Sequence, residues 1–261
     1  MEQRHISVRN GLFSTILRSG GHGEPLLYLH GVLGLGDTET FLTELAQNFT
    51  IYAPSHPGFG TSTGLDHIDD IFDLVVYYND FLDALELESV HVVGHSLGGM
   101  FAAEFAALCP QRVRKLILVS PLGLWDDGYP VLDFFALRSA DYPAAFWSDP
   151  ECAAATAMHG IAADREGQLE AFLSRMQSFG SAGKFLWPIP DRGLKKRIHR
   201  ITARTHIVWG ADDRLTPVHY AQTFQQLIPG ATTAILQKCG HLPMYEDCAS
   251  FTGVVCEFLH S

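Results

Sequence analysis

Short apolar runs alternate along this chain with longer segments whose apolar residues recur at helical intervals. Runs suited to buried strands lie at residues 6–8, 12–17, 26–29, 51–53, 90–93, 116–119, 206–209 and 233–236. Segments of helical spacing lie among them at 38–48, 68–85, 100–108, 217–227 and 247–259. Strands that alternate with helices pair in parallel and are covered on both faces. The order therefore predicts an α/β fold with a mostly parallel sheet of eight strands.

The alternation is interrupted once, between the sixth and seventh strands. Residues 125–199 contain no strand-like run, and we predict that they form a helical cap inserted into a core made of residues 1–124 and 200–261. The cap is rich in aromatic residues, which can line a pocket above the sheet or form a small core of the cap itself. They are Trp125, Phe134, Phe135, Phe146, Trp147, Phe172, Phe179, Phe185 and Trp187.

Composition and charge indicate a globular domain and argue against a nucleic-acid partner. With 261 residues, 47% of them hydrophobic, the chain can bury a large core as one domain. Its formal net charge of −11 argues against nucleic acid, because binding to the phosphate backbone depends on clustered Lys and Arg. The densest basic group is spaced as one solvated face of a helix, and an anion site is the alternative interpretation. It consists of Arg192, Lys195, Lys196, Arg197 and Arg200.

The cysteines indicate free thiols in a reducing compartment. Cys109, Cys152, Cys239, Cys248 and Cys256 are odd in number and widely scattered, with no metal-ligand spacing. The sequence contains neither a P-loop nor a metal-ligand cluster, so we expect neither a cofactor nor a metal. We find no signal-like apolar run near the start and no uninterrupted apolar stretch of about 18 residues. We therefore expect a cytoplasmic protein without a membrane span, acting on a small molecule.

The motif with the clearest chemistry is Gly94-His95-Ser96-Leu97-Gly98. A β-branched run ends just before it, and a helical segment begins just after it. A tight turn from strand to helix lifts the serine hydroxyl above the sheet and places it at a helix N-terminus, where free N–H groups stabilise negative charge. Glycine is expected at the flanking positions, because neighbouring chain passes there too closely for a Cβ. Ser96 is thus the candidate nucleophile.

A serine hydroxyl needs a base, and an imidazole base needs an acid that fixes its tautomer. Residues 206–217 (HIVWGADDRLTP) supply a strand, a glycine turn and two adjacent carboxylates, Asp212 and Asp213. Residues 238–243 (KCGHLP) follow the last strand and place His241 beyond the acid. The residues alone leave either carboxylate open as the acid.

Several motifs together resemble the α/β-hydrolase superfamily across nearly the whole chain. They are a strand followed by HGxxG at residues 26–34, then GHSLGG, then WGxxDxxxP, and a Gly-His pair after the last strand. The resemblance implies the chain order Ser96, Asp213 and His241 for nucleophile, acid and base. It selects Asp213 over Asp212 as the acid.

The same resemblance implies two backbone donors and one alternative acid. The N–H groups of Val32 and Leu97 are expected to form the oxyanion hole. His30 is expected to hold its turn by hydrogen bonds without taking part in the chemistry. Some members of the superfamily take the acid from after the sixth strand, where this chain has Asp126 and Asp127.

The resemblance also narrows the reaction. Serine at the elbow disfavours dehalogenases and epoxide hydrolases, which use a carboxylate nucleophile. Residues 123–137 resemble a capped group that contains esterases and the C–C bond hydrolases of meta-cleavage products. Those C–C hydrolases usually have Asn just before the nucleophile and Trp just after the catalytic His, whereas this chain has His95 and Leu242. We therefore expect a serine hydrolase of uncharged carboxylic esters of small to medium size. The alternatives are C–C hydrolysis of vinylogous diketones, lactone hydrolysis and, more distantly, a non-catalytic binding protein of this fold.

Overall fold

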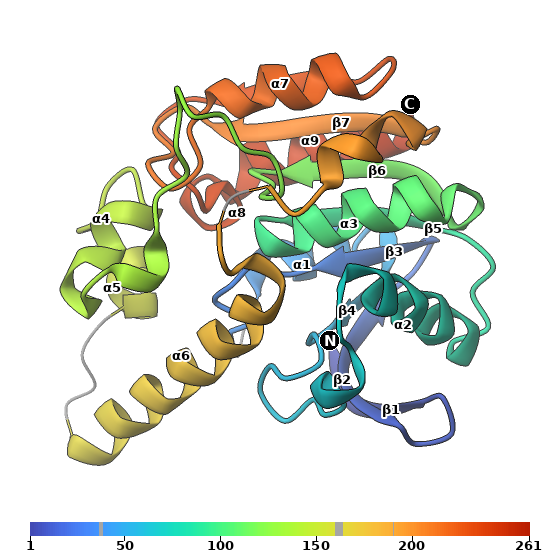
Figure 1. Ribbon diagram of the computed structural model, residues 1–261, viewed down its shortest axis with the longest axis horizontal. Helices are drawn as coiled ribbons and strands as arrows, with labels where there is room; N and C mark the ends of the chain where they lie inside the picture. Colours follow the sequence, from blue (N-terminus) through green and yellow to red (C-terminus); the bar gives the residue numbers. More distant parts are fainter. Residues whose placement is uncertain (37–38, 160–163, 190) are drawn as a thin grey trace.

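The computed structural model describes residues 1–36, 39–159, 164–189 and 191–261, and its centre is one sheet of eight strands (Figure 1). The order across the sheet is β1-β2-β4-β3-β5-β6-β7-β8. β1 and β2 are antiparallel to their neighbours, and every pair from β4 to β8 across the sheet is parallel, so the predicted fold class is confirmed. The strands are β1 (Glu2–Val8), β2 (Phe13–Gly21), β3 (Glu24–Leu29), β4 (Phe49–Pro54), β5 (Val90–His95), β6 (Val113–Val119), β7 (Arg204–Gly210) and β8 (Thr232–Leu236).

The register of the parallel strands brings several loops to one edge of the sheet. Leu29 at the end of β3 pairs with Gly94 of β5, and His95 of β5 pairs with Val119 at the end of β6. Val119 pairs in turn with Val208 of β7. The loops that follow these strands therefore emerge side by side. The loops after β3, β5 and β7 carry candidate site residues, and the loop after β6 carries the alternative acids.

Helices cover both faces of the sheet, as the alternating pattern predicts (Figure 1). α2 and α3 pack together on one face, α1 and α9 pack together on the other, and α7 packs on β7 and β8. The helices of this core are α1 (Thr40–Leu45), α2 (Ile71–Ala84), α3 (Leu97–Leu108), α7 (His219–Leu227), α8 (Pro243–Glu246) and α9 (Cys248–His260).

The first helix is shorter than its apolar spacing predicts. We predicted a helix over residues 38–48, whereas α1 ends at Leu45 and residue 38 lies outside the described residues. The N–H groups of Gln47 and Asn48 donate to the carbonyls three residues earlier, at 3.1 and 3.0 Å. The chain thus tightens into turns at this end and enters β4 directly.

The described part of the segment between β6 and β7 contains helices joined by irregular stretches and no strand, as predicted. α4 (Tyr142–Phe146), α5 (Ala153–His159) and α6 (Arg165–Leu186) lie beyond the edge of the sheet, and α6 extends away from it (Figure 1). Residues 160–163 and 190 of the predicted cap lie outside the described residues. The limits 125–199 stay a prediction.

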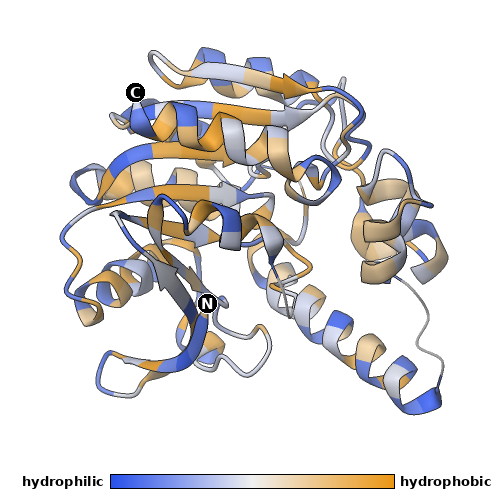
Figure 2. Ribbon diagram, turned by 180° about the vertical axis from the view of Figure 1, so that it is seen from behind, coloured by the Kyte–Doolittle hydropathy of each residue, from blue (hydrophilic) through white to orange (hydrophobic). Residues whose placement is uncertain are grey.

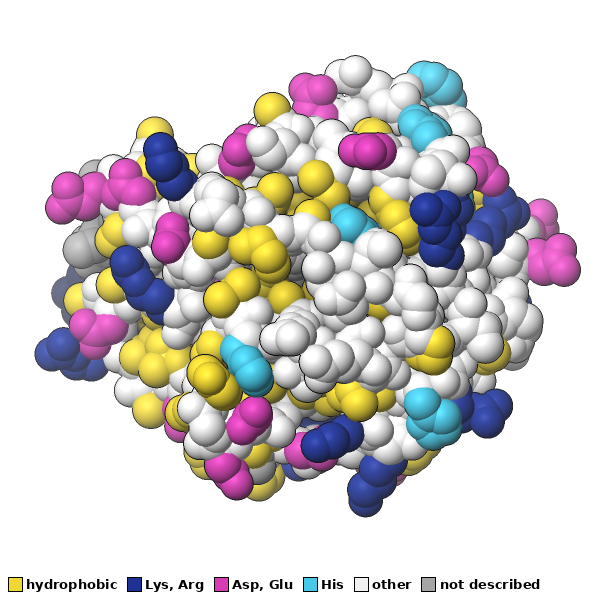
Figure 3. Space-filling view, turned by 90° about the horizontal axis from the view of Figure 1, so that it is seen from above, with side chains coloured by type: hydrophobic (Ala, Val, Ile, Leu, Met, Phe, Trp, Pro, Cys, Tyr) yellow, Lys and Arg dark blue, Asp and Glu magenta, His cyan; other side chains and the backbone are white. Residues whose placement is uncertain are grey.

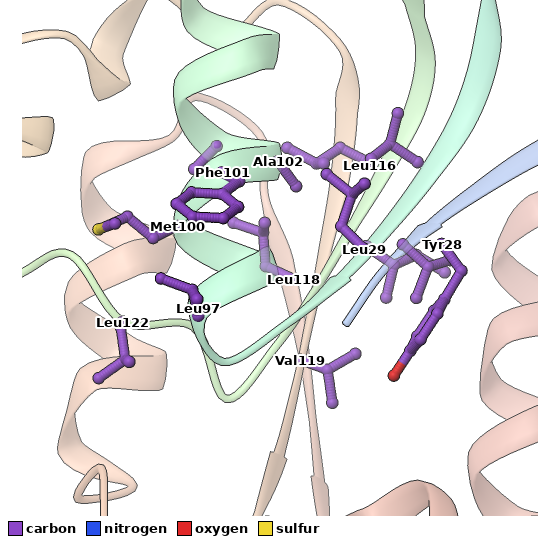
Figure 4. Close-up of a cluster of buried hydrophobic side chains, with 14 of the residues drawn as sticks. Tyr28, Leu29, Leu97, Met100, Phe101, Ala102, Leu116, Leu118, Val119 and Leu122 are labelled. Carbon is purple, nitrogen blue, oxygen red and sulfur yellow. The ribbon is translucent and has the colours of Figure 1, made fainter. Parts of the chain in front are cut away.

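The core beneath the elbow fixes the start of α3. Figure 4 shows Met100, Phe101 and Ala102 of α3 beside side chains of the neighbouring strands, among them Leu116 and Leu118 of β6. All five are at most 2% exposed. Burying one such large side chain stabilises a fold by about 1.5–3 kcal/mol, so these contacts hold the first turn of α3 against the sheet. Figure 2 shows the same concentration of hydrophobic residues along the central strands.

The basic cluster is not the solvated helix face that its spacing indicates. It lies around two short 3₁₀ helices, η5 (Leu194–Lys196) and η6 (Ile198–Arg200). Arg197 points inward and donates to both carboxylate oxygens of Glu104 in α3, at 2.6 and 2.5 Å. The prediction is therefore wrong for Arg197, because a buried carboxylate draws it out of solvent.

The rest of the surface is mixed in character. Figure 3 shows hydrophobic side chains gathered toward the cap, with Lys and Arg side chains scattered around the rim. All five cysteines are free thiols. Among the described helices, none combines the length and the apolar character that crossing a membrane requires.

Candidate active site

The candidate nucleophile lies on a strained turn between β5 and α3. Ser96 has φ of 55°, a conformation that costs a residue with a Cβ about 1–3 kcal/mol. Its N–H donates to the carbonyl of Val119 at 2.9 Å, which fastens the turn to β6. A Cβ on Gly94 would lie 2.4 Å from the carbonyl oxygen of Gly98, and one on Gly98 would lie 2.2 Å from that of Leu29. Glycine is thus required at both positions, as predicted.

The structure brings the three predicted side chains into one chain of hydrogen bonds. Nε2 of His241 lies 2.8 Å from Oγ of Ser96, and Nδ1 of His241 lies 2.9 Å from Oδ2 of Asp213. Ser96 and His241 are fully buried, and Asp213 is 7% exposed. An ionised carboxylate only accepts hydrogen bonds, so Nδ1 carries the imidazole proton and Nε2 presents its lone pair to the serine hydroxyl. This is the arrangement in which a hydroxyl can lose its proton to a base.

The carboxylate of Asp213 is held by donors from its own loop. The N–H groups of Leu215 and Thr216 both donate to Oδ1 at 2.9 Å, and the hydroxyl of Thr216 donates to Oδ2 at 2.8 Å. These donors stabilise the ionised form and fix its orientation toward His241. Our reading of the sequence missed Thr216. The sequence signal was the position of Asp213 at a turn that leads to a helix. An Asp at such a turn typically accepts from the backbone N–H groups two and three residues later.

The alternative acids do not meet His241. The side chain of Asp212 is exposed. Asp126 accepts from the N–H of Gly128 and lies 3.4 Å from His219, and Asp127 accepts from the indole of Trp125. Of the four carboxylates considered, the structure thus brings only Asp213 to the imidazole.

The turn after β3 lies directly against the nucleophile. A Cβ on Gly31 would lie 3.1 Å from Cβ of Ser96, so the chain passes the elbow at van der Waals distance. Val32 follows Gly31, and Leu97 is the first residue of α3, where an N–H has no acceptor within the helix. Within the described residues neither N–H group donates to a protein acceptor. Both are therefore available to a bound oxygen.

Two buried histidines hold this turn in place. Nδ1 of His30 donates to the carbonyl of Gly31 at 2.8 Å, and its Nε2 accepts from the N–H of His56 at 3.0 Å. His56 donates back to the carbonyl of His30 at 2.9 Å. Burial lowers the pKa of His30 to about 4, so the ring is neutral near pH 7. The expected structural role of His30 is confirmed.

Two further side chains hold the loop of His241, and the sequence did not reveal either. Nε2 of His95 donates to the carbonyl of His241 at 2.8 Å, and burial holds the pKa of His95 well below its usual range. Glu246 accepts from the N–H of Gly240 at 2.7 Å and from the N–H and hydroxyl of Ser148, at 2.8 and 2.6 Å. Glu246 thus joins the loop of the candidate base to the segment after α4.

A cavity of about 690 Å³ opens beside these residues. Its lining includes Gly31 and Val32 of the turn after β3, together with His95 and Leu242, which adjoin the buried Ser96 and His241 in sequence. The remaining lining comes from β3, from the segment that leads into α1, from the first residue of α1, from the end of α4, from α5 and α6, and from α8. Among the described residues no group of three or more His, Cys, Asp or Glu side chains is placed to hold a metal ion.

The aromatic residues of the predicted cap do not form the wall of this cavity. Of the nine, only Phe146 is among the described lining residues. Phe134, Phe135 and Phe179 contact one another, with ring centroids 4.3 to 5.8 Å apart, and Phe185 stacks edge-on against Phe101 of α3. These rings therefore find partners within the cap and against the core, which is one of the two alternatives that the sequence leaves open. Smaller apolar side chains line the cavity instead, among them Leu33, Leu35, Ala154, Ala157 and Met158.

Comparisons with known proteins agree with this fold. Residues 26–252 match the alpha/beta hydrolase family. An uncharacterised protein of Mycobacterium tuberculosis is 31% identical over 93% of this chain and 77% of its own. The 2-hydroxy-6-oxo-2,4-heptadienoate hydrolase of Pseudomonas putida is 28% identical over 97% of this chain and 95% of its own. An esterase of Rhodococcus sp. shares the fold with a TM-score of 0.74 at 22% identity, covering 100% of this chain and 99% of that one. The chain therefore belongs to the alpha/beta hydrolase family.

Proposed function

We propose that this protein is a serine hydrolase that cleaves uncharged carboxylic esters of small to medium size through an acyl-enzyme. The observation that carries the proposal is the pair of short hydrogen bonds joining Ser96, His241 and Asp213 beside a cavity. A buried serine bonded in this way to a base, which is bonded in turn to a carboxylate, is the arrangement needed to activate a weak nucleophile.

In the first half of the reaction Ser96 attacks the ester carbonyl. His241 takes the hydroxyl proton at Nε2, and Asp213 stabilises the imidazolium that forms. The N–H groups of Val32 and Leu97 donate to the oxyanion, and one such donor lowers a barrier by about 3–4 kcal/mol. The tetrahedral intermediate collapses when His241 returns the proton to the departing alcohol.

In the second half water replaces the alcohol. His241 takes a proton from the water as its oxygen attacks the acyl carbonyl, and the same two N–H groups hold the second oxyanion. Return of that proton to Oγ of Ser96 releases the acid and restores the starting state. Every proton in this cycle passes through Nε2 of His241.

The lining of the cavity supports an uncharged substrate. Among the described lining residues there is no Lys or Arg. A buried carboxylate on a substrate needs a basic partner or several donors, and burying it without them costs several kcal/mol. Leu33, Leu35 and Met158 instead offer contacts that suit an apolar chain.

C–C bond hydrolysis is the second candidate, favoured by the Pseudomonas putida relative at 28% identity. The name of that relative describes a substrate with a carboxylate, a dienoate. The two candidates therefore differ in the charge of the substrate, and the absence of a basic residue from the described lining favours the ester.

Hydrolysis assays with purified protein test the proposal. We expect p-nitrophenyl butyrate and hexanoate to be hydrolysed, with kcat/KM well above that for a 2-hydroxy-6-oxo-dienoate. Ser96→Ala should abolish turnover, and Asp213→Asn should lower kcat by about 10⁴-fold, the loss known for a misoriented imidazole. Asp212→Asn, which removes the neighbouring exposed carboxylate, is the matched control and should retain normal activity. A strong preference for the dienoate, or near-normal activity of Asp213→Asn, would overturn the proposal.

A further inference from the structure

One acidic side chain lines the cavity and has no part in the proposed mechanism. Glu39 lies at the start of α1 and is 6% exposed. It is the only Asp or Glu among the described lining residues. Its place in the wall that also includes Gly31, Val32 and His95 means that a substrate bound near Ser96 shares a cavity with a carboxyl group.

The carboxyl group is held in a fixed position by two donors. The N–H of Gly36 donates to Oε1 at 2.6 Å, and the hydroxyl of Tyr245 donates to Oε2 at 2.6 Å. Tyr245 lies in α8, four residues after His241, so the group is fastened to the same segment that carries the candidate base. The carboxyl is therefore built into the cavity wall and does not swing freely in solvent.

These two bonds leave the carboxyl group able to accept more. Each carboxylate oxygen has two acceptor positions, and each uses one here. The charge of Arg18 acts on Glu39, but Arg18 donates to the carbonyl of Gly36 and does not line the cavity. Desolvation on burial raises the pKa of Glu39 above its usual value, although the hydrogen bonds from Tyr245 and Gly36 oppose the rise. A further donor supplied by a ligand would remove part of that cost.

We propose that Glu39 is a specificity-determining residue, which selects esters whose buried end carries a hydrogen-bond donor and rejects those whose end is a carboxylate. The proposal deepens the proposed ester hydrolysis and rests on it. The favoured end is a hydroxyl, the uncharged donor that fits the proposed substrates; an ammonium group also donates to a carboxylate, and its rank is an outcome of the test. A carboxylate end meets Glu39 without a cation between them, and like charges brought together in a desolvated site cost several kcal/mol.

The test is a series of p-nitrophenyl esters that differ only at the far end of a six-carbon acyl chain. Hexanoate ends in a methyl group, and the 6-hydroxyhexanoate, 6-aminohexanoate and adipate monoesters end in hydroxyl, ammonium and carboxylate. For the native protein we expect kcat/KM for the adipate monoester to be about 100-fold lower than for the hydroxyl-ended ester. The hydroxyl-ended or the ammonium-ended ester should exceed hexanoate, and their order distinguishes a neutral donor from a cation.

Three variants assign the selectivity. Glu39→Gln keeps the shape of the side chain and should reduce discrimination against the adipate monoester by about tenfold or more. Tyr245→Phe removes one of the two donors that hold the carboxylate and favour its ionised form, so discrimination should fall, but by less than in Glu39→Gln. Glu44→Gln removes a carboxylate from the exposed side of the same helix, outside this cavity, and should leave the ratios as in the native protein.

A binding measurement separates this inference from the reaction itself. Calorimetry on Ser96→Ala protein, with and without Glu39→Gln, compares 1-hexanol, 1,6-hexanediol, 6-amino-1-hexanol and 6-hydroxyhexanoate as ligands. Hydrolysis of none of the esters would refute the proposed function, and the order of binding would still report on Glu39. Hydrolysis or binding with the same ratios in Glu39→Gln as in the native protein would overturn the inference and leave ester hydrolysis standing.

Discussion

The buried ion pair between Glu104 and Arg197 provides a sharp test of the packing that supports the site. Glu104 lies in α3, the helix that begins just after Ser96, and Arg197 lies where the chain returns from α6 toward β7. The two bonds are 2.6 and 2.5 Å long, and the side chains are 2% and 17% exposed. We predict that Glu104→Gln, which keeps the shape and removes the charge, destabilises the fold substantially.

The size of the effect follows from the burial of the two groups. Removing one partner of a buried pair costs about 3–5 kcal/mol, because the other charge is left without compensation. Arg197 retains some exposure and lies over the ring of Phe72 at 5.3 Å, so the lower end of that range applies. With about 2–4 °C of Tm per kcal/mol for a domain of this size, Tm should fall by about 6–12 °C.

Calorimetry and urea unfolding of purified variants measure this change. Arg200→Gln, an exposed member of the same basic cluster, is the control and should alter the free energy of unfolding by less than about 0.5 kcal/mol. Glu104→Gln combined with Arg197→Met should recover part of the loss, since removing both charges leaves neither unpaired. A Tm for Glu104→Gln equal to that of the native protein would refute the reasoning, as would a double variant that loses the sum of the two single effects.

Three further predictions concern the site and its surroundings. Thr216→Val removes a donor to the carboxylate of Asp213 worth about 1.5–3 kcal/mol, so kcat/KM for an ester should fall by about 10- to 100-fold, and a rate within twofold of normal would contradict this. Glu246→Ala removes the acceptor that joins Gly240 to Ser148, so kcat should fall by a larger factor than KM changes, while the circular dichroism spectrum stays native. An unchanged kcat would show that this connection is not needed for activity. Between pH 7 and pH 5 the unfolded chain takes up a proton at His30, whereas the folded protein does not, because the folded pKa of about 4 lies below the ordinary 6.5. The free energy of unfolding should therefore decrease as the pH falls, by about 2 kcal/mol from this group. Urea unfolding that gives the same free energy at both pH values would contradict that sign.

Features coded by neighbouring residues were predictable from the sequence. The strands follow from short apolar runs, and the elbow follows from glycines that flank Ser96 where a Cβ would strike the backbone. The roles of Asp213 and His241 were expected from motifs after successive strands, and parallel register brings such loops together at one edge. The packed aromatic rings of the cap were visible as a composition, although their partners were not.

Features that depend on contacts between distant segments were missed. Arg197 and Glu104 are 93 positions apart, and His95 meets the carbonyl of His241 across 146 positions. A basic cluster at helical spacing has the same pattern whether it faces water or a buried carboxylate, so only the fold distinguishes the two. The polar groups around Glu39 were likewise hidden, since an isolated Glu before a helix usually lies in solvent.

Covalent labelling of Ser96 tests the central claim most directly. A fluorophosphonate reacts with a serine only when a neighbouring base takes its proton and N–H groups hold the phosphoryl oxygen. We predict that peptide mass spectrometry will find a stoichiometric adduct on Ser96 in the native protein, a much slower reaction in His241→Asn, and no adduct in Ser96→Ala. An unmodified Ser96 after prolonged exposure of correctly folded protein would contradict the account.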